Sequence, residues 1–481
     1  MAEPSVRSPH YAPDRRTALV FTGSGVDGAY HAGAVRALNE AGVRVDLVAG
    51  RGVGAVAALY AAIDGGSRLW EPSGLWRRPA VRGLYPWRSA LRRVVAGLAL
   101  ASVVLLVPPL ALAVGAAVYQ IAVLLDVVGS GTGAWLAQQW ESVRLLAFAH
   151  DGLPTRVPQV VAAVLAVVVL AVLVAAVRAR ATAPARRDVT GGVWWTVLGA
   201  PLSATPTVDY FITGLWDLLR GGARVAQPTR ADLSRRYAEL LSDNLGQPGF
   251  RELLIVAHDL DARQDLVFAL LGRDWRRPFF LRRQTTGLDR RSAEAVDLAG
   301  ASRDHVLDAV AGALTLPVAT DAQLIGFAPE SYWRGETHRL TDRPAALVRV
   351  LEEVASAGVR QVIVVTAAEE LGGPHELSRR RSAPRARLGE FLASAEAAAV
   401  RDALNVASPW FDALFVVRPS HNPVTPLDTF GAFDERSDRV QVVGELVDRG
   451  YEDAYRQFID PVVGASGEQI ASPPDVVRSA E

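Results

Sequence analysis

The chain has 481 residues, which is enough for more than one domain, and its 51 basic residues are balanced by 51 acidic residues. A formal charge of zero gives no overall field that would attract nucleic acid, so we expect no nucleic-acid partner. Cysteine is absent and the eight histidines show no paired spacing, which argues against disulfides and metal sites. We therefore expect no metal and no cofactor.

The first 90 residues alternate between short apolar runs and small-residue helical patterns. Residues 1–16 contain prolines and charges without an apolar run, which is atypical of a secretory signal. A β-α-β-α order with short connections then predicts parallel strands with right-handed crossovers. The predicted elements are a strand at Thr17–Phe21, a helix with Ala32, Val35 and Leu38 on one face, a strand at Val43–Ala49 and a helix at Val53–Ile63.

Two long apolar runs follow. No charged residue occurs in Val94–Leu125 or in Pro158–Val177, and each run reaches the roughly 20 residues that a helix needs to cross a bilayer. Buried core helices are the alternative, but unbroken Leu, Val and Ala leave no polar face for water. Pro108 and Pro109 interrupt the first run and predict one kinked span, with a re-entrant pair of helices as the alternative.

Arginines predict the orientation of this helical hairpin. Six arginines lie between Arg77 and Arg93 and four between Arg178 and Arg187, whereas the connection between the runs has more acidic than basic residues. Basic flanks stay on the cytoplasmic side of a membrane. We expect two transmembrane helices in a bacterial-type inner (plasma) membrane, with the soluble domain and both termini in the cytoplasm and the connecting loop outside.

The pattern after the hairpin again combines strands and helices. Further strands are predicted at Leu253–Ala257, Gln361–Thr366 and Leu414–Val417, with helices around 306–314 and 392–404. Together with the first 90 residues, they predict an α/β fold with a central, mostly parallel sheet. The expected organisation is an N-terminal tail (1–16), the first part of the α/β domain (17–90), the hairpin (91–180), an amphipathic cap or linker (181–250), the second part of the α/β domain (251–463) and a disordered tail (464–481).

Two glycine-rich loops carry the candidate chemistry. The first, Gly23-Ser24-Gly25-Val26-Asp27-Gly28, opens the first helix, so its backbone amides predict a cradle for an anion or an oxyanion. The same letters fit the dinucleotide fingerprint G-x-G-x-x-G, with Asp46 as the ribose-binding acid. However, a ribose-binding acid should close the second strand, and Asp46 precedes Leu47–Ala49. A dinucleotide-binding oxidoreductase remains the least favoured alternative.

The second loop, Gly50-Arg51-Gly52-Val53-Gly54, joins the second predicted strand to a helix of small residues. This is the setting in which a nucleophile elbow presents a reactive hydroxyl. Gly52 stands where a hydrolase would have its serine, and a glycine has no group that can attack a carbonyl. The sequence therefore contains the frame of a hydrolase site without its nucleophile.

With this order of glycine loop, helix and elbow, the chain resembles the patatin-like phospholipase family over Thr17–Ile63 and, more loosely, over Leu253–Ala367. The resemblance implies a patatin-like three-layer α/β domain, interrupted here by the hairpin, and a serine–aspartate dyad that hydrolyses lipid acyl esters. On that pattern Gly52 replaces the serine, Arg334 stands where the aspartate belongs, and Asp27 occupies a position that is commonly arginine.

These departures predict a degenerate, non-catalytic protein that binds a membrane lipid or acyl chain or serves as a scaffold for a possible protein partner, in an undefined oligomeric state. The alternative is an active acyl hydrolase that uses displaced residues. Ser24 in the first loop and Asp321 and Asp342 further along the chain are the candidates for that role.

Three other features have two interpretations each. Arg379–Arg381 with Arg385 and Arg387 could contact anionic headgroups or form a solvated loop. Trp194–Leu219 could be an interfacial cap over a lipid-facing pocket or an ordinary core helix. His258 beside Asp259 is interpreted as structural and not as a catalytic base.

Overall fold

The computed structural model describes residues 11–127, 132–147, 149, 153–182, 199–281, 293–329, 331, 333–370 and 382–464. They divide into two compact units. Unit 1 comprises Met1–Pro86 and Leu202–Glu481, and unit 2 comprises Trp87–Pro201. Of the two predicted tails, 11–16 and Gly464 fall within the described residues. Tyr11 is buried in unit 1, where its hydroxyl donates to the Arg44 carbonyl at 3.2 Å.

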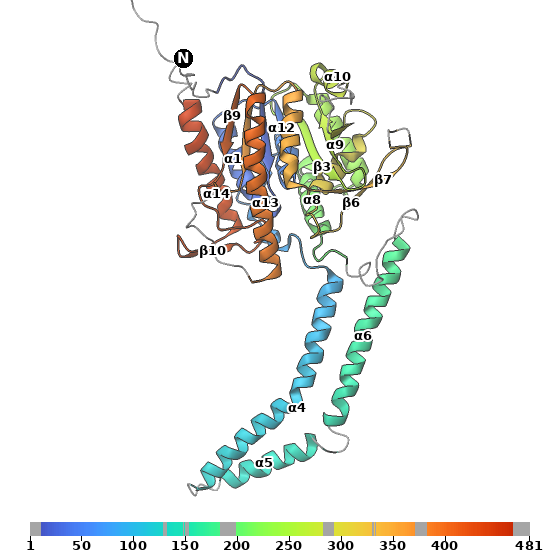
Figure 1. Ribbon diagram of the computed structural model, residues 1–481, viewed down its shortest axis with the longest axis vertical. Coiled ribbons are helices and arrows are strands. Elements are labelled where there is room, and N and C mark those ends of the chain that lie inside the picture. The colour runs from blue at the N-terminus through green and yellow to red at the C-terminus, as the bar shows by residue number, and fades with distance from the viewer. Residues whose placement is uncertain are drawn as a thin grey trace, which may run out of the picture. The chain divides into compact units, whose positions relative to one another are not determined.

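A nine-stranded sheet forms the centre of unit 1 (Figure 1). Its main path runs β5-β4-β3-β2-β1-β8-β9, and β7 pairs with both β3 and β6. The pairs β1–β2, β2–β3, β1–β8, β8–β9 and β4–β5 are parallel, whereas β3–β4, β3–β7 and β6–β7 are antiparallel. The strands are β1 (Thr17–Thr22), β2 (Leu47–Gly50), β3 (Glu252–Asp259), β4 (Gln264–Leu270), β5 (Ala293–Asp297), β6 (Gln323–Gly326), β7 (Thr337–Thr341), β8 (Gln361–Thr366) and β9 (Ala413–Val417). A separate pair is formed by β10 (Ala432–Asp434) and β11 (Arg439–Gln441).

Helices cover both faces of the sheet. The helices of unit 1 are α1 (Gly28–Glu40), α2 (Gly54–Ala61), α3 (Ser67–Trp70), α8 (Thr205–Arg220), α9 (Arg230–Asn244), α10 (Arg273–Leu281), α11 (Val306–Ala313), α12 (Leu347–Ser356), α13 (Pro384–Ala407) and α14 (Val443–Ala454). Short 3-10 helices occur at Gly25–Asp27, Leu75–Arg77, Pro79–Gly83, Arg303–His305, Pro344–Ala346 and Ser408–Trp410, and Tyr455–Gly464 is π-helical.

The alternation of side chains along the strands explains the layers. Ala18 and Val20 of β1 point to one face and pack in a core cluster with Val350 of α12 and Val400 of α13. The other face is covered by helices that include α1 and α2, where Phe21 contacts the ring of His31. The prediction of an α/β fold with a central, mostly parallel sheet is confirmed.

Several predicted elements occur with small shifts. The strands predicted at Thr17–Phe21 and Gln361–Thr366 are β1 and β8, whereas the strand expected from Val43 begins only at Leu47. The sequence patterns did not predict β4 to β7 or α12. The strands β5 to β7 have only four or five residues each, which gives little apolar periodicity to recognise. The seven-residue strand β4 follows β3 after only four residues.

The region predicted as a cap contains α8 and α9, and both are packed into unit 1. Tyr60 of α2 donates to the Phe211 carbonyl of α8 at 2.8 Å, and Tyr237 of α9 donates to the Leu59 carbonyl at 2.6 Å. The buried residues of α8, among them Phe211 and Leu215, make it part of the core of unit 1. Trp194 and Trp195 lie outside the described residues.

Unit 2 consists of α4 (Ser89–Val127), α5 (Thr132–Ala147) and α6 (Leu153–Thr182). Two segments are long and apolar enough to cross a membrane, Ser89–Val107 and Arg156–Val174, and a shorter apolar helix spans Ala113–Leu125. Figure 1 shows that α4 bends partway along its length while remaining one helix. The connection that was expected to be a loop contains α5. This helix packs closely on α4: a Cβ built on Gly115 of α4 would lie 1.9 Å from the Trp140 ring of α5.

Candidate active site

The second glycine loop forms a sharp turn between β2 and α2. Gly52 has a φ of +55°, a conformation that L side chains rarely adopt, and the Ala55 amide donates to its carbonyl at 3.2 Å as α2 begins. The turn therefore has the strand–turn–helix geometry of a nucleophile elbow. All five residues of the loop, Gly50 to Gly54, are buried.

There is no room for a side chain at the tip of this elbow. A Cβ built on Gly52 would lie 2.1 Å from the Gly23 carbonyl oxygen, which is backbone of the first glycine loop. Gly54 is similarly constrained, because its Cβ would lie 2.4 Å from the Phe21 carbonyl oxygen. The glycines thus permit the two loops to contact each other directly, and the volume that a serine would need is occupied by main chain.

Backbone donors of the first glycine loop are satisfied within the protein. The Ser24 amide donates to Oδ2 of the Asp27 carboxyl group at 2.9 Å, and the Val26 amide donates to the Pro426 carbonyl at 2.9 Å. The amide of Val53, the residue after the elbow tip, donates to the Gly23 carbonyl at 2.9 Å. In a hydrolase the amide after the nucleophile stabilises the oxyanion. Here these three amides already have acceptors, so they cannot receive an oxyanion without rearrangement.

A buried charge cluster lies beneath the elbow. The Arg51 side chain is fully buried, and its Nη1 donates to both carboxylate oxygens of Asp342 at 3.3 Å. Its Nη2 forms a short ion pair with Glu396 of α13. Glu396 also accepts a hydrogen bond from the Thr22 hydroxyl at 2.5 Å. These contacts hold β1, the elbow, the end of β7 and α13 together.

Burial dominates the protonation of this cluster. It raises the pKa of Asp342 to about 6 although Arg51 favours the charged form, and it raises the pKa of Asp27 to about 8. At neutral pH Asp27 is therefore mostly protonated and Asp342 mostly ionised. Burial also lowers the pKa of His31 to about 4, so His31 is neutral and its Nε2 donates to the Thr22 carbonyl at 3.0 Å.

The position expected for Arg334 is occupied by Asp342. The Oδ2 atom of Asp342 lies 3.1 Å from where a Cβ of Gly52 would be, whereas Arg334 is exposed in the turn before β7. The two residues flank opposite ends of β7, a strand of five residues that spans about 17 Å. Asp342, which follows β7, therefore lies beside the elbow, whereas Arg334, which precedes β7, does not.

The residues proposed as displaced catalytic groups are only partly brought together. The Ser24 hydroxyl donates to Asp342 Oδ2 at 3.3 Å, but both side chains are almost completely buried, at 3% and 1% exposed. Asp321 instead lines a small polar cavity of about 100 Å³ with Ser203 and Arg230. Ser24 and Asp342 thus form a hydroxyl–carboxylate pair whose carboxylate is held by Arg51.

The geometry also argues against a dinucleotide site. Asp46 lies directly before β2, where its Oδ2 accepts from the Thr17 amide at 2.9 Å. A ribose-binding acid must instead lie at the carboxyl end of the second strand. Within the part of the chain that the structure describes, no group of three or more potential ligand side chains could hold a metal ion.

Glu396 and Pro426 were not singled out from the sequence. Glu396 could have been found, since it lies in an alanine-rich helix with Leu392 and Val400 at i − 4 and i + 4, on the buried face. A charge on an apolar helix face needs a buried partner. Pro426 contributes only a backbone carbonyl, which leaves no signal in a single sequence.

Comparison with known proteins finds one family model that matches the first part of the chain. Residues 19–124 match the model of the family described as patatin-like phospholipase, so the resemblance indicated by the two glycine loops is confirmed there. No curated protein matches the chain. Among solved structures, VipD from Legionella pneumophila is 15% identical with a TM-score of 0.29, over 93% of this chain and 66% of that chain, just under two thirds of its length.

Proposed function

We propose that this patatin-like chain is a non-catalytic, membrane-anchored protein that binds lipid through unit 2. The observation that carries the proposal is the contact between Gly52 and the Gly23 carbonyl, which occupies the place of a nucleophilic side chain. Without that nucleophile, only residual catalysis from binding would remain.

The buried charge cluster supports a structural role for the former site. Arg51, Asp342 and Glu396 are each at most 2% exposed and pair with one another, so they offer no free group to a substrate. A buried ion pair of this kind is a poor source of net stability but is costly to break. We infer that the cluster keeps the elbow closed and leaves unit 1 as a rigid scaffold for a protein partner.

The exposed surface of unit 2 supports membrane anchoring. Side chains along both long helices are largely exposed in the absence of a bilayer, among them Leu110 at 63%, Leu124 at 69% and Val167 at 65%. Helices that are apolar on all sides are stable in lipid and not in water. With the arginine-rich flanks retained inside, unit 1 lies in the cytoplasm beside a bacterial-type plasma membrane.

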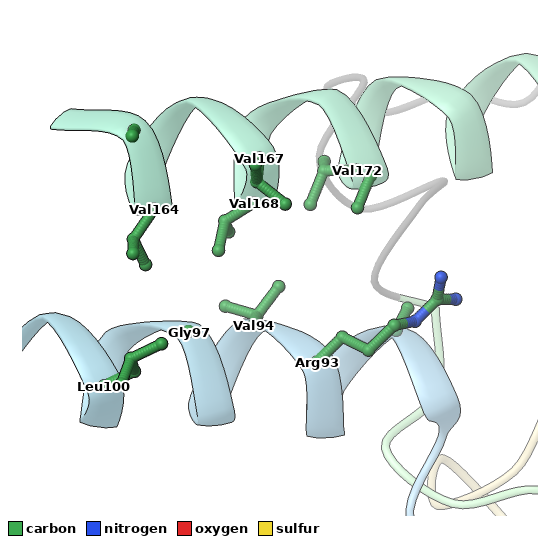
Figure 2. A pocket seen from close by; sticks show the side chains of 11 residues that line it. Arg93, Val94, Gly97, Leu100, Val164, Val167, Val168 and Val172 are labelled. Carbon is green, nitrogen blue, oxygen red and sulfur yellow. The ribbon is translucent and has the colours of Figure 1, made fainter. Parts of the chain in front are cut away.

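A cavity of about 400 Å³ between α4 and α6 supports lipid binding. It lies within the size range of small-molecule pockets, roughly 300–1,000 Å³. Figure 2 shows Val94 and Val168 facing each other across the gap, with Arg93 at one end. Arg93 Nε donates to the Ser89 carbonyl at 3.2 Å, and no described residue accepts from its Nη atoms. An acyl chain between the helices with an anionic headgroup at Arg93 fits this arrangement.

The contact between Ser24 and Asp342 favours one second candidate, an acyl hydrolase with a displaced dyad. Release of fatty acid from phosphatidylglycerol–phosphatidylethanolamine vesicles by the reconstituted full-length protein separates the two functions. We expect wild type, Ser24→Ala and Asp342→Asn to release fatty acid at the rate of empty vesicles. Wild-type turnover that Ser24→Ala abolishes would establish the hydrolase and overturn the non-catalytic proposal.

The natural absence of cysteine makes the anchoring testable with single-cysteine variants. Asp14→Cys places the cysteine at an exposed position of unit 1, and Ser142→Cys places it at an exposed position of α5. With a membrane-impermeant maleimide, we expect Ser142→Cys to react in intact cells and Asp14→Cys only in inverted vesicles. Labelling of both from the same side would contradict the two-span arrangement.

Binding of pyrene-labelled lipids to the detergent-solubilised protein tests the cavity. Because one arginine near an anionic surface contributes about 1 kcal/mol, Arg93→Gln should lower the preference for phosphatidylglycerol over phosphatidylcholine about fivefold. Ala163→Phe, which fills the cavity, should weaken binding of both lipids. Unchanged binding in both variants would exclude this cavity as the lipid site.

A further inference from the structure

Three apolar side chains are exposed near the C-terminal β-hairpin. Phe430 is 70% exposed, and Phe433 of β10 and Val440 of β11 are each 55% exposed. Phe433 and Val440 are directly opposite in the antiparallel pair, so their side chains lie on one face. We call Phe430, Phe433 and Val440 the apolar hairpin face. Exposed aromatic residues in such a cluster commonly mark a contact surface.

Hydrogen bonds place this face beside the point where the chain leaves unit 1. The Arg385 guanidinium donates to the Leu427 carbonyl at 3.0 Å and to the Leu84 and Tyr85 carbonyls at 3.0 and 2.9 Å. The Thr429 hydroxyl, next to Phe430, donates to the Arg82 carbonyl at 3.3 Å.

The same contacts correct the interpretation of the basic cluster. Arg385 is half-buried and binds three backbone carbonyls, so it is neither a solvated nor a lipid-facing side chain. It fixes Leu84 and Tyr85, which we call the exit segment because the chain leaves unit 1 after them. Burial lowers its pKa, but the guanidinium remains charged. Arg379–Arg381 lie outside the described residues. Arg385 thereby couples Leu84 and Tyr85, which precede α4, to Leu427, which lies three residues before the apolar hairpin face.

The first glycine loop lies at this end as well. The Val26 amide of the first glycine loop donates to Pro426, one residue before Leu427. The carboxyl ends of β1 and β2, the exit segment and the apolar hairpin face therefore share one end of unit 1. α4 begins at Ser89, four residues after Tyr85, so a bilayer that receives α4 must lie close to this end.

From this placement we propose that the apolar hairpin face rests in the headgroup region of the bilayer that α4 and α6 cross. The proposal rests on the anchoring proposed above. The turn between the two strands carries Glu435, Arg436 and Asp438, so the hairpin lies along the surface and does not enter the hydrocarbon. Membrane lipid is favoured over a second copy of the chain as the contact, because Thr429, next to Phe430, is hydrogen-bonded to Arg82, only seven residues before α4.

A fluorescent probe on a single cysteine tests the proposal. Val440→Cys carries an NBD group in full-length protein reconstituted in vesicles that contain nitroxide-labelled lipids. We expect it to lose roughly half of its fluorescence, because an interfacial apolar face is buried about 5–10 Å into the headgroup and acyl boundary, where the nitroxide lipids are. The matched control is Asp14→Cys, which is exposed before β1, at the opposite end of a strand of six residues, and should not be quenched.

A second substitution distinguishes membrane contact from mere proximity. Phe433→Ser in the Val440→Cys background should reduce the quenching without changing the apparent Tm, since Phe433 is more than half exposed. Absence of quenching at position 440, with the expected labelling of Ser142→Cys from outside, would overturn this proposal and leave the anchoring intact. Burial of the probe that increases with protein concentration, without quenching by nitroxide lipids, would assign the apolar hairpin face to contact with a second copy. That result would also overturn this proposal. Labelling of Ser142→Cys and Asp14→Cys from the same side would instead contradict the anchoring.

Discussion

Restoring the missing serine should damage the fold and not create an enzyme. In Gly52→Ser, a non-glycine residue in the left-handed region costs about 1–2 kcal/mol. The new Cβ would also meet the Gly23 carbonyl at 2.1 Å, so that carbonyl must move and the Val53 amide loses its acceptor. An unsatisfied buried amide costs about 1–3 kcal/mol. Together we expect a loss of about 2–5 kcal/mol.

Thermal unfolding followed by tryptophan fluorescence measures this loss, since the chain has 11 tryptophans. At about 2 °C per kcal/mol for a large domain, the apparent Tm of Gly52→Ser should fall by roughly 4–10 °C. Gly42→Ser is the matched control, because Gly42 has a φ of +67° but nothing within 4 Å of its Cβ position. It should show the conformational cost alone. An equal decrease in apparent Tm for Gly52→Ser and Gly42→Ser, or hydrolysis of vesicle lipids by Gly52→Ser, would refute the closed elbow.

Two further predictions concern the buried charges. Arg51→Met should cost about 3–5 kcal/mol, because it leaves Asp342 and Glu396 buried without their cation, and adding Asp342→Asn and Glu396→Gln should recover most of it in the same thermal assay. A single variant as stable as wild type would contradict the ion-pair assignment. The pKa of Asp27 is raised from 3.8 to about 8, so its folded form retains a proton that the unfolded form releases. The stability that comes from this protonated carboxyl group is complete below pH 4 and is lost as the pH rises to 8. Asp27→Asn should therefore make the apparent Tm less dependent on pH over that interval. A pH dependence of Tm identical to that of wild type would show that Asp27 is ionised in the folded protein.

The sequence predicted the part of the fold that depends on local patterns. The glycine loop, α1 and the elbow are contiguous, so spacing alone defined them, and the apolar length of α4 and α6 was equally visible. The charge cluster was not predictable in this way. Arg51, Asp342 and Glu396 are brought together by the order of the strands and by α13, over separations of up to 345 residues. Asp342 was considered as a displaced group, but its place at the elbow depends on the β3–β7 pairing.

The pairing of β2 with β3 constrains how the protein is made. Leu47 pairs with Glu252 and Gly50 with Ile255, yet the whole of unit 2 is synthesised between these two strands. If unit 2 enters a bilayer, the chain must cross it an even number of times, since an odd number would strand the two halves of one sheet in different compartments. A nascent chain with one failed crossing would leave β2 without β3 as its partner. The unpaired edge of β2 could then pair with other chains, so correct insertion of unit 2 and completion of the sheet depend on each other.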